Sequence, residues 1–301
     1  MQPKSLLAAL FASALLVVPA RAQDNFPNKP IKIVLPVPAG SALDIAARAI
    51  GEQLANQWGQ QVLIETRPGA GGLIAGQAVA SAQPDGYTLL AGPSSLFVIL
   101  PAQKDKLPID VNRDFVQLGT IVGSAVLFVA VSPKLGVSNW AEFVALAKSK
   151  PGQIVVGTNG AGTLPHFAGL VIEKKSGVPI NVVPYNQGGT MAAVADIMGG
   201  RVHGTIEAVF GLRGPLQSGD LKLIGQMVPQ PEPEFPDVQP VGVSAIGFMT
   251  LAAPAATPPA IQRRLAEGLR QALDSPTVKQ RYADLGVPIR NYTSEQTTTC
   301  R

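Results

Sequence analysis

The chain alternates short apolar runs with segments in which apolar residues recur every three or four positions. The first run covers residues 31–37, and the first periodic segment covers residues 43–58. Its apolar face consists of Leu43, Ala47, Ile50, Leu54 and Trp58. The run predicts a strand, and the periodic segment predicts an amphipathic helix. Further strands are expected at 62–65 and 87–91 around a small-residue helix at 73–81, so the succession predicts a mostly parallel sheet.

The middle of the chain predicts two strands close together, at 115–121 and 126–131, where the chain is expected to leave a first lobe. A second series of elements follows. Its helices are expected at 140–148, 165–176 and 190–198, and its strands at 154–157, 181–184, 203–209 and 221–227. After a proline-rich connection at 229–240, a strand at 248–252 and a helix at 259–273 return to the first lobe. We therefore expect one lobe from residues 23–123 and 245–301, and another from 124–244.

One motif occurs in both lobes: a strand, a bend rich in Gly or Pro, and a helix start, at 31–44 and at 154–166. A helix start presents backbone N–H groups without intrahelical partners and a partial positive charge, which suits a carboxylate. Hydrogen-bond donors in these bends are Ser41, Asn159 and Thr163. Asp44 is interpreted as a helix cap or a brace of the loop rather than a base. Two such bends predict a ligand cleft between the lobes, although two simple tight turns remain an alternative.

The N-terminal 22 residues have the pattern of a signal peptide. Lys4 precedes an apolar stretch at 6–20 that is too short to span a bilayer, and Ala20-Arg21-Ala22 fits a cleavage site. We expect cleavage after Ala22 and export to the periplasm, with a membrane anchor as the alternative. Removal of this segment lowers the formal charge from +4 to +2, which argues against a nucleic-acid partner.

Other kinds of site are poorly supported by the sequence. The chain has one cysteine, Cys300, and two histidines, so neither a disulfide nor a metal site is expected, and no cofactor motif occurs. Gly69-Ala70-Gly71-Gly72 lacks the GK[ST] ending of a phosphate loop and is interpreted as a packing turn. Ser94 follows a strand without a GxSxG elbow. A serine hydrolase that uses Ser94 or Ser41 is therefore a remote alternative, and we expect no enzyme.

Several motifs, taken together, resemble those of a known family. They are Lys29-Pro30-Ile31-Lys32-Ile33-Val34, the bend ending at Asp44, Arg67-Pro68-Gly69-Ala70-Gly71-Gly72, Pro84-Asp85-Gly86-Tyr87-Thr88-Leu89-Leu90, Gly162-Thr163-Leu164-Pro165-His166 and Val183-Pro184-Tyr185. In order and spacing they are similar to the Bug family, the extracytoplasmic solute-binding receptors of tripartite tricarboxylate transporters. The resemblance extends from about Phe26 to Glu295.

The resemblance implies a type II-like, two-lobed α/β periplasmic binding protein, each lobe a mostly parallel sheet flanked by helices. It further implies a monomer that closes on a small organic acid (a dicarboxylate, an amino acid or an aromatic acid) and delivers it to the transporter's membrane components. Presentation of the ligand to a sensor kinase is an alternative. The implied ligand-binding residues are Val37, Gly40, Ser41, Ala42, Asp44, Ser94, Asn159, Gly162, Thr163, His166, Tyr185 and Glu207.

The sequence departs from the family pattern in three places. The family loop commonly runs Pro-Pro-Gly-Gly, whereas this chain has Pro38-Ala39-Gly40-Ser41. Glu207 replaces the common Asp and favours a ligand with an amine or hydroxyl, unless it is simply a solvated charge. The segment 293–296 resembles the start of the family's last helix, which relatives usually continue. A shortened last helix predicts exposed apolar surface and marginal stability.

Overall fold

The structure is a computed structural model that describes residues 25–39, 41–103 and 106–288. The strands are β1 (Ile31–Leu35), β2 (Val62–Thr66), β3 (Thr88–Pro93), β4 (Phe115–Val131), β5 (Ile154–Asn159), β6 (Ile180–Tyr185), β7 (Gly204–Ala208), β8 (Lys222–Gln226) and β9 (Ile246–Pro254). The helices are α1 (Ala42–Trp58), α2 (Leu73–Ala80), α3 (Leu100–Gln103), α4 (Trp140–Ser149), α5 (Leu164–Ser176), α6 (Gly189–Met198), α7 (Val209–Gln217), α8 (Pro259–Asp274) and α9 (Pro276–Leu285). Within these residues, no helix is long and apolar enough to cross a membrane.

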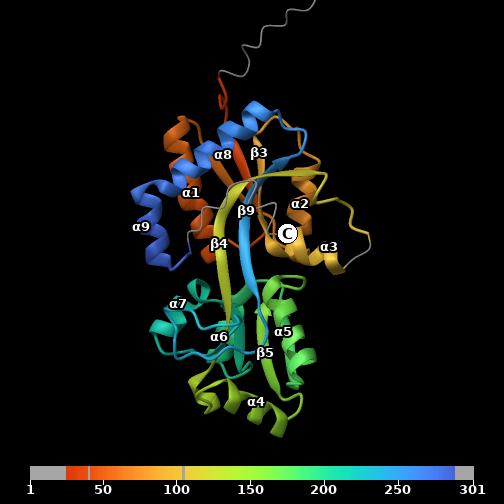
Figure 1. The fold of residues 1–301 in the computed structure, drawn as a ribbon, viewed down its shortest axis with the longest axis vertical. Helices are drawn as coiled ribbons and strands as arrows, with labels where there is room; N and C mark the ends of the chain where they lie inside the picture. Colours follow the sequence, from red (N-terminus) through yellow and green to blue (C-terminus); the bar gives the residue numbers. More distant parts are fainter. Residues whose placement is uncertain (1–24, 40, 104–105, 289–301) are drawn as a thin grey trace, which may run out of the picture.

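The strands form two groups that share β4, and β9 belongs to the first group, where it pairs with β3 and β4. The order of paired strands is β2-β1-β3-β9-β4-β7-β5-β6, with β8 also paired to β4. In the first half β1 pairs in parallel with β2 and β3, and in the second half β5 pairs in parallel with β6 and β7. Helices cover both groups, and β4 and β9 run from one half into the other (Figure 1). The predicted α/β fold with mostly parallel sheets flanked by helices is confirmed.

The region between the halves differs from the sequence prediction. The two strands expected at 115–121 and 126–131 are one continuous strand, β4. The two-strand prediction was wrong because Gly123 and Ser124 interrupt the local apolar pattern, while pairing with β9 carries the strand through with three shifts in register. Ser124 has a φ of 46°, a left-handed conformation that a non-glycine residue seldom adopts. The predicted lobe boundaries at residues 123 and 244 stay a prediction.

The other predicted strands and helices are confirmed, with ends that shift by two residues at most. Three helices of the described residues were not predicted: α3, α7 and α9, of which α3 is a single turn of four residues. Helix α7 contains Pro215 and two glycines, which are poor helix formers, and α9 is a short helix that begins at Pro276. In both cases the tertiary contacts, rather than the local propensity, stabilise the helix.

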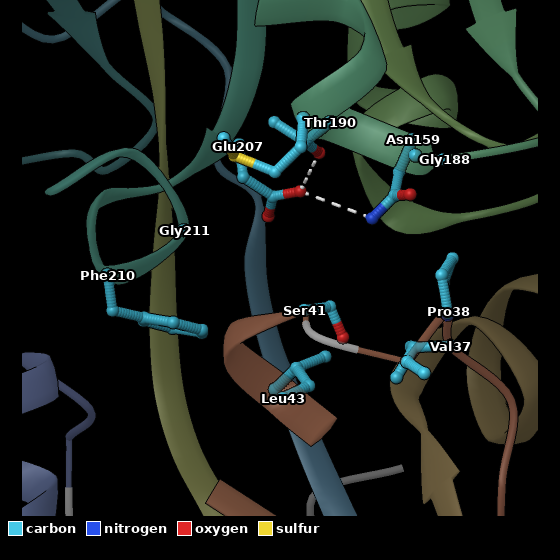
Figure 2. Close-up of a pocket in the computed structure, with 13 residues that line it drawn as sticks. Val37, Pro38, Ser41, Leu43, Asn159, Gly188, Thr190, Glu207, Phe210 and Gly211 are labelled. Carbon is cyan, nitrogen blue, oxygen red and sulfur yellow. Dashed lines mark hydrogen bonds between the residues drawn. The ribbon is translucent and has the colours of Figure 1, made fainter. Parts of the chain in front are cut away.

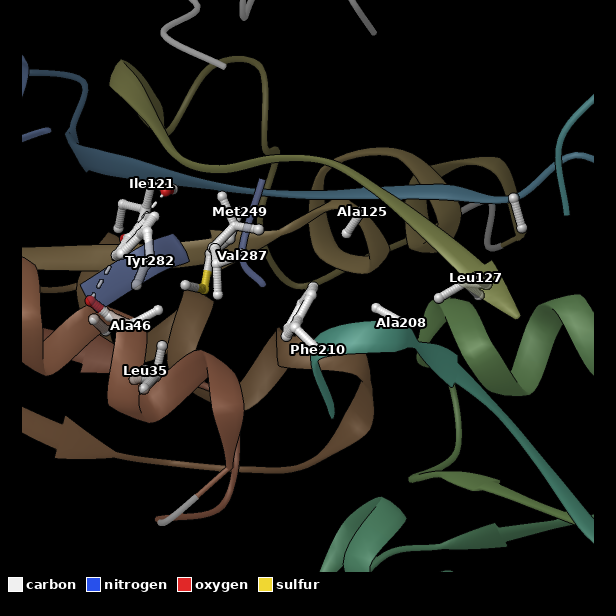
Figure 3. Packing of buried hydrophobic residues seen from close by; sticks show 14 of the residues in the cluster. Leu35, Ala46, Ile121, Ala125, Leu127, Ala208, Phe210, Met249, Tyr282 and Val287 are labelled. Atoms are coloured by element: carbon white, nitrogen blue, oxygen red, sulfur yellow. Dashed lines mark hydrogen bonds between the residues drawn. The ribbon is translucent and has the colours of Figure 1, made fainter. Parts of the chain in front are cut away.

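A continuous apolar core extends through both halves and reaches the space between them. Tyr282 of α9 is fully buried in it, and its hydroxyl donates to the carbonyls of Ile121 (3.2 Å) and Ala46 (3.5 Å) (Figure 3). Burial raises the pKa of the Tyr282 hydroxyl. Phe210 of α7 belongs to the same core and is 9% exposed. The first residues of α7 are thereby fixed to the framework that positions the site.

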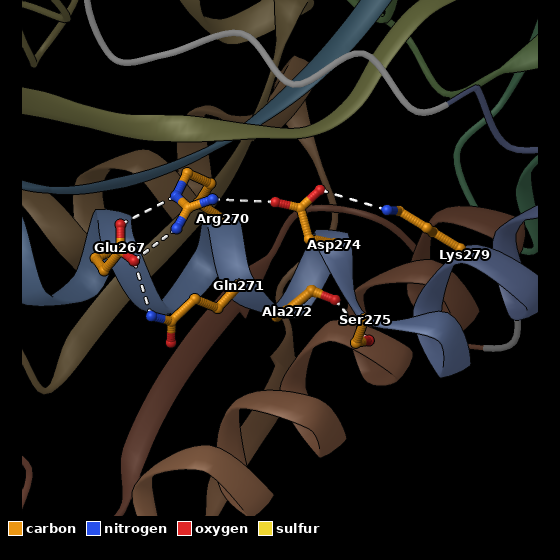
Figure 4. Close-up of polar contacts among 7 residues, drawn as sticks. All are labelled: Glu267, Arg270, Gln271, Ala272, Asp274, Ser275 and Lys279. Atoms are coloured by element: carbon orange, nitrogen blue, oxygen red, sulfur yellow. Dashed lines mark hydrogen bonds and ion pairs between the residues drawn. The ribbon is translucent and has the colours of Figure 1, made fainter.

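The corner between α8 and α9 carries a polar network at the surface. Arg270 contacts Glu267 at 2.8 Å and Asp274 at 3.2 Å, and Lys279 lies 3.5 Å from the other oxygen of Asp274 (Figure 4). Ser275 caps α9 by accepting a hydrogen bond from the amide of Val278. Exposed ion pairs add little stability individually. Of these ion pairs, only that between Lys279 and Asp274 joins α9 to α8.

Candidate functional site

Two neighbouring cavities lie where the two halves face each other. The larger has a volume of about 240 Å³ and is lined by the β1–α1 loop, Asn159, the start of α6 and the β7–α7 junction. The smaller, of about 90 Å³, extends from the same walls toward Ser94 and Thr163. Both cavities are lined by Val37, Leu43, Asn159, Glu207 and Phe210. In Figure 2 the first bend lies opposite Glu207, Thr190 and Asn159, so residues from both halves converge on one space.

The first bend, between β1 and α1, ends in a capped helix. Ser41 is the N-cap of α1, and its hydroxyl accepts a hydrogen bond from the amide of Asp44 at 3.3 Å. The Asp44 side chain is 2% exposed and accepts a hydrogen bond from Arg48 Nε at 3.0 Å, as expected of a brace. Val37 and Ser41 line the larger cavity. Gly40 lies outside the described residues, and Ala42 is the first residue of α1.

The second bend, between β5 and α5, is held by hydrogen bonds within the bend. Thr163 is the N-cap of α5, and its hydroxyl donates to the carbonyl of Gly160 at 2.8 Å. Gly162 has a φ of +81°, and its amide donates to Nδ1 of His166 at 3.5 Å. Burial lowers the pKa of His166, so this ring is neutral at pH 7 and able to accept that hydrogen bond. His166 and Gly162 brace the bend, whereas Thr163 and Asn159 line the cavities.

Glu207 occupies the wall opposite the first bend, near the end of β7. Its Oε2 accepts hydrogen bonds from Thr190 Oγ1 (2.5 Å) and Asn159 Nδ2 (3.2 Å), and its Oε1 accepts one from the amide of Ala208 (2.8 Å). Burial raises the pKa of Glu207, and these three hydrogen bonds oppose the rise. Among the described residues, no Lys or Arg forms an ion pair with it.

Ser94 and Tyr185 occupy different environments. Ser94 is 6% exposed and lines the smaller cavity, directly before the helical turn η3 (Ser95–Ile99). Tyr185 lines neither cavity; its hydroxyl donates to Asp196 Oδ2 at 2.6 Å, and burial raises its pKa to about 12. The structure thus brings Ser94 to the space between the halves and turns Tyr185 toward α6. Ligand contact by any of these residues stays a prediction.

Several residues that line the larger cavity were not predicted from the sequence. Gly188, Gly189 and Thr190 enter it from the start of α6, and Phe210 enters it from α7. A signal for the first three exists in the sequence, because β6 is followed by two glycines and a helix start, the same pattern as at the two recognised bends. Phe210 had no such signal, since α7 itself was not predicted.

Comparison with known proteins places the chain in a family. The family described as Tripartite tricarboxylate transporter family receptor matches residues 46–300. A UPF0065 protein of Bordetella bronchiseptica is 34% identical over 94% of this chain and 84% of its own length. Protein BugT of Bordetella pertussis is 30% identical over 97% of this chain and 91% of its own length.

A solved structure shares the fold. MatC of Rhodopseudomonas palustris, determined with bound malate, superposes with a TM-score of 0.79 and is 26% identical; the match covers 87% of this chain and 90% of MatC. The resemblance drawn from the sequence motifs is therefore confirmed. The chain belongs to the receptor family of the tripartite tricarboxylate transporters, the Bug family of periplasmic solute-binding proteins.

Proposed function

We propose that this protein captures a small organic carboxylate between its two halves and delivers it to the membrane components of a tripartite tricarboxylate transporter. The supporting observation is the convergence of the β1–α1 bend, the β5–α5 bend and Glu207 on one space. The ligand-binding residues we propose are those of the two bends that line the cavities, together with Ser94. Closure of the halves around the ligand is the signal that the transporter reads.

A carboxylate is the ligand group that suits the two bends. A helix start leaves its first amides without backbone acceptors and adds about half a positive charge. In α1 one of these amides, that of Asp44, already donates to Ser41 Oγ, and in α5 Pro165 has no amide hydrogen, so the other first-turn amides are the donors available to a ligand. Such an interaction contributes roughly 0.3–2 kcal/mol, whereas micromolar binding requires roughly 8 kcal/mol. The rest of the binding free energy must come from hydrogen bonds donated by hydroxyl groups and from burial of the ligand against Val37, Leu43 and Phe210, all of which line the cavities. The malate bound to MatC is consistent with a ligand of this class.

We further propose that the ligand is bound without chemical change. A hydrolase that used Ser94 would require a general base near its hydroxyl. The two histidines are engaged elsewhere: His166 Nδ1 accepts from the amide of Gly162, and His203 Nδ1 accepts from the amide of Val155 at 3.0 Å. Neither histidine lines the two cavities. Among the described residues, Ser94 thus has no histidine in its cavity, which supports binding without turnover.

Export of a monomer to the periplasm completes the proposal. The segment proposed as a signal peptide, residues 1–22, lies outside the described residues. Expression in a bacterial host followed by intact-mass measurement of the periplasmic fraction should give a chain that starts at Gln23. Recovery of the whole chain in the membrane fraction would instead support an anchor.

Titration calorimetry tests the binding proposal directly. Purified protein is titrated with a panel of dicarboxylates, amino acids and aromatic acids, and at least one acid should bind with a Kd of about micromolar. Thr163→Phe should abolish that binding because its ring fills the space beside the second bend. Ser149→Phe, which adds the same ring at an exposed position in the same half, should leave it unchanged. No heat with any acid, or full affinity in Thr163→Phe, would refute the proposed site.

A further inference from the structure

The wall opposite the first bend presents a carboxylate and no cation. Glu207 lines both cavities, and none of the residues that line them is a Lys, Arg or His. A ligand with a second carboxylate would therefore meet a like charge and no counter-charge. In a confined space of low dielectric constant such repulsion is stronger than in water.

The polar side chains next to Glu207 already donate hydrogen bonds to it. Thr190 Oγ1 donates its single hydrogen to Oε2, and Asn159 Nδ2 donates one of its two hydrogens to the same oxygen, so only the second amide hydrogen of Asn159 stays available to a ligand while Glu207 is ionised. The remaining neighbours in the larger cavity are mostly apolar, among them Leu43 and Phe210. This wall therefore offers a ligand mainly hydrogen-bond acceptors.

Glu207 has capacity for one more donor. A carboxylate offers about four acceptor positions on its two oxygens, and three are used by Thr190, Asn159 and the amide of Ala208. Oε1 accepts only the Ala208 bond among the described residues, and in Figure 2 it points into the open space between Glu207 and the first bend. A donor on the ligand can reach it from that space.

We propose that Glu207 selects, among small carboxylic acids, those that carry an ammonium or hydroxyl group, and discriminates against unsubstituted acids of the same skeleton. This inference rests on the proposed function. The ligand carboxylate lies at the two bends, and its donor group completes the hydrogen bonding of Glu207. An ammonium group also neutralises the charge of Glu207, so amino acids are the preferred class.

Matched acids test this inference. Calorimetry is performed with three skeletons, each as its amino, hydroxy and unsubstituted form: alanine, lactate and propionate; glutamate, 2-hydroxyglutarate and glutarate; phenylalanine, 3-phenyllactate and 3-phenylpropionate. Within the skeleton that binds, a substituted acid should bind at least about tenfold more tightly than the unsubstituted one, because a hydrogen bond to a charged group is lost. Equal or tighter binding of the unsubstituted acid would overturn the inference and leave the proposed function standing. Absence of binding by all nine acids would overturn both.

A second measurement assigns the selectivity to Glu207. Glu207→Gln retains the shape of the side chain: its oxygen can accept from the Ala208 amide, and its nitrogen can donate to Thr190 Oγ1 and to a reversed Asn159 amide. The preference for the substituted acid should fall at least about tenfold in this variant. Glu173→Gln removes the same charge from an exposed position of α5 and should keep the preference of the unmodified protein. A preference unchanged in Glu207→Gln would place the selecting group elsewhere.

Discussion

Gly71 and Gly162 touch backbone to backbone across the space between the two halves. A Cβ atom added to Gly71 would lie 2.6 Å from the carbonyl oxygen of Gly162, closer than real Cβ contacts occur. Gly71 belongs to the turn η2 (Ala70–Gly72), which Ser95 Oγ holds by donating to the Gly71 carbonyl at 2.8 Å. The glycine-rich turn of the first half is therefore a contact surface for the β5–α5 bend of the second half, which we propose binds the ligand.

Gly71→Ala should prevent the halves from approaching as closely as they do here. The added methyl group collides with backbone rather than with a mobile side chain, so the second bend must move away. We expect affinity for the acid identified by calorimetry to fall at least about tenfold. Small-angle scattering with ligand present should show a larger radius of gyration than for the unmodified protein.

Gly59→Ala is the matched control for this variant. Gly59 has a φ of +64°, nearly that of Gly71 at +65°, but an added Cβ would meet no atom within 4 Å. Both variants should lose about 1–2 kcal/mol of stability from left-handed strain. Only Gly71→Ala should lose affinity; an equal loss in both would show that strain, not contact, is responsible.

Ser41→Ala should weaken both the first helix and the binding of the acid. The hydroxyl of Ser41 caps α1 and faces the larger cavity, so its removal should cost about 1 kcal/mol of unfolding free energy. Asn139→Ala is the control, because Asn139 caps α4 far from the cavities: its side-chain oxygen accepts a hydrogen bond from the amide of Glu142 at 3.0 Å. Denaturant unfolding should show similar losses for both variants, and calorimetry should show weaker binding for Ser41→Ala alone. Intact affinity in Ser41→Ala would remove this hydroxyl from the site.

Glu207→Gln should stabilise the ligand-free protein at neutral pH. The folded-state pKa of Glu207 is raised above its ordinary value of 4.5 by burial, so the folded state favours the protonated form. The contribution of protonated Glu207 to the stability of the folded protein is fully present below pH 4.5 and is lost as the pH rises through the folded-state pKa. Thermal unfolding should therefore give Glu207→Gln the higher Tm at pH 7, with a difference that shrinks on acidification toward pH 4. A lower Tm at pH 7 would mean that the hydrogen bonds to the carboxylate outweigh its burial.

Arg213→Met should loosen the connection between α7 and α9. The Arg213 guanidinium donates to the carbonyls of Asp284 (2.8 Å) and Ala283 (3.3 Å) at the end of α9, which lies in the other half of the molecule. Loss of these bonds should cost about 1 kcal/mol in denaturant unfolding. Arg281→Met changes an exposed residue of α9 and should have little effect. Equal stability of the two variants would show that Arg213 does not join the helices.

The expectation about the end of the chain stays a prediction. Residues 289–301 lie outside the described part of the structure.

The two bends could be predicted from the sequence because they are local features. A strand, a Pro- or Gly-rich loop and a capped helix start are set by residues close together in the chain, and Ser41 and Thr163 are indeed the N-caps of α1 and α5. Their placement in two lobes followed from the order of strands and helices. Local pattern failed at β4, where Gly123 and Ser124 suggested a break that pairing with β9 spans.

The composition of the shared site was decided by tertiary structure. Glu207 meets Asn159 from 48 positions away and Thr190 from 17, so only the packing of β5, β7 and α6 brings these groups together. Tyr185, on the end of β6, turns to Asp196 instead of the cavities, a choice set by α6. The sequence by itself determined which segments could hold an acid, since propensity and capping act between neighbours. The tertiary structure decided which side chains surround it, because burial and hydrogen bonding there depend on contacts between distant segments.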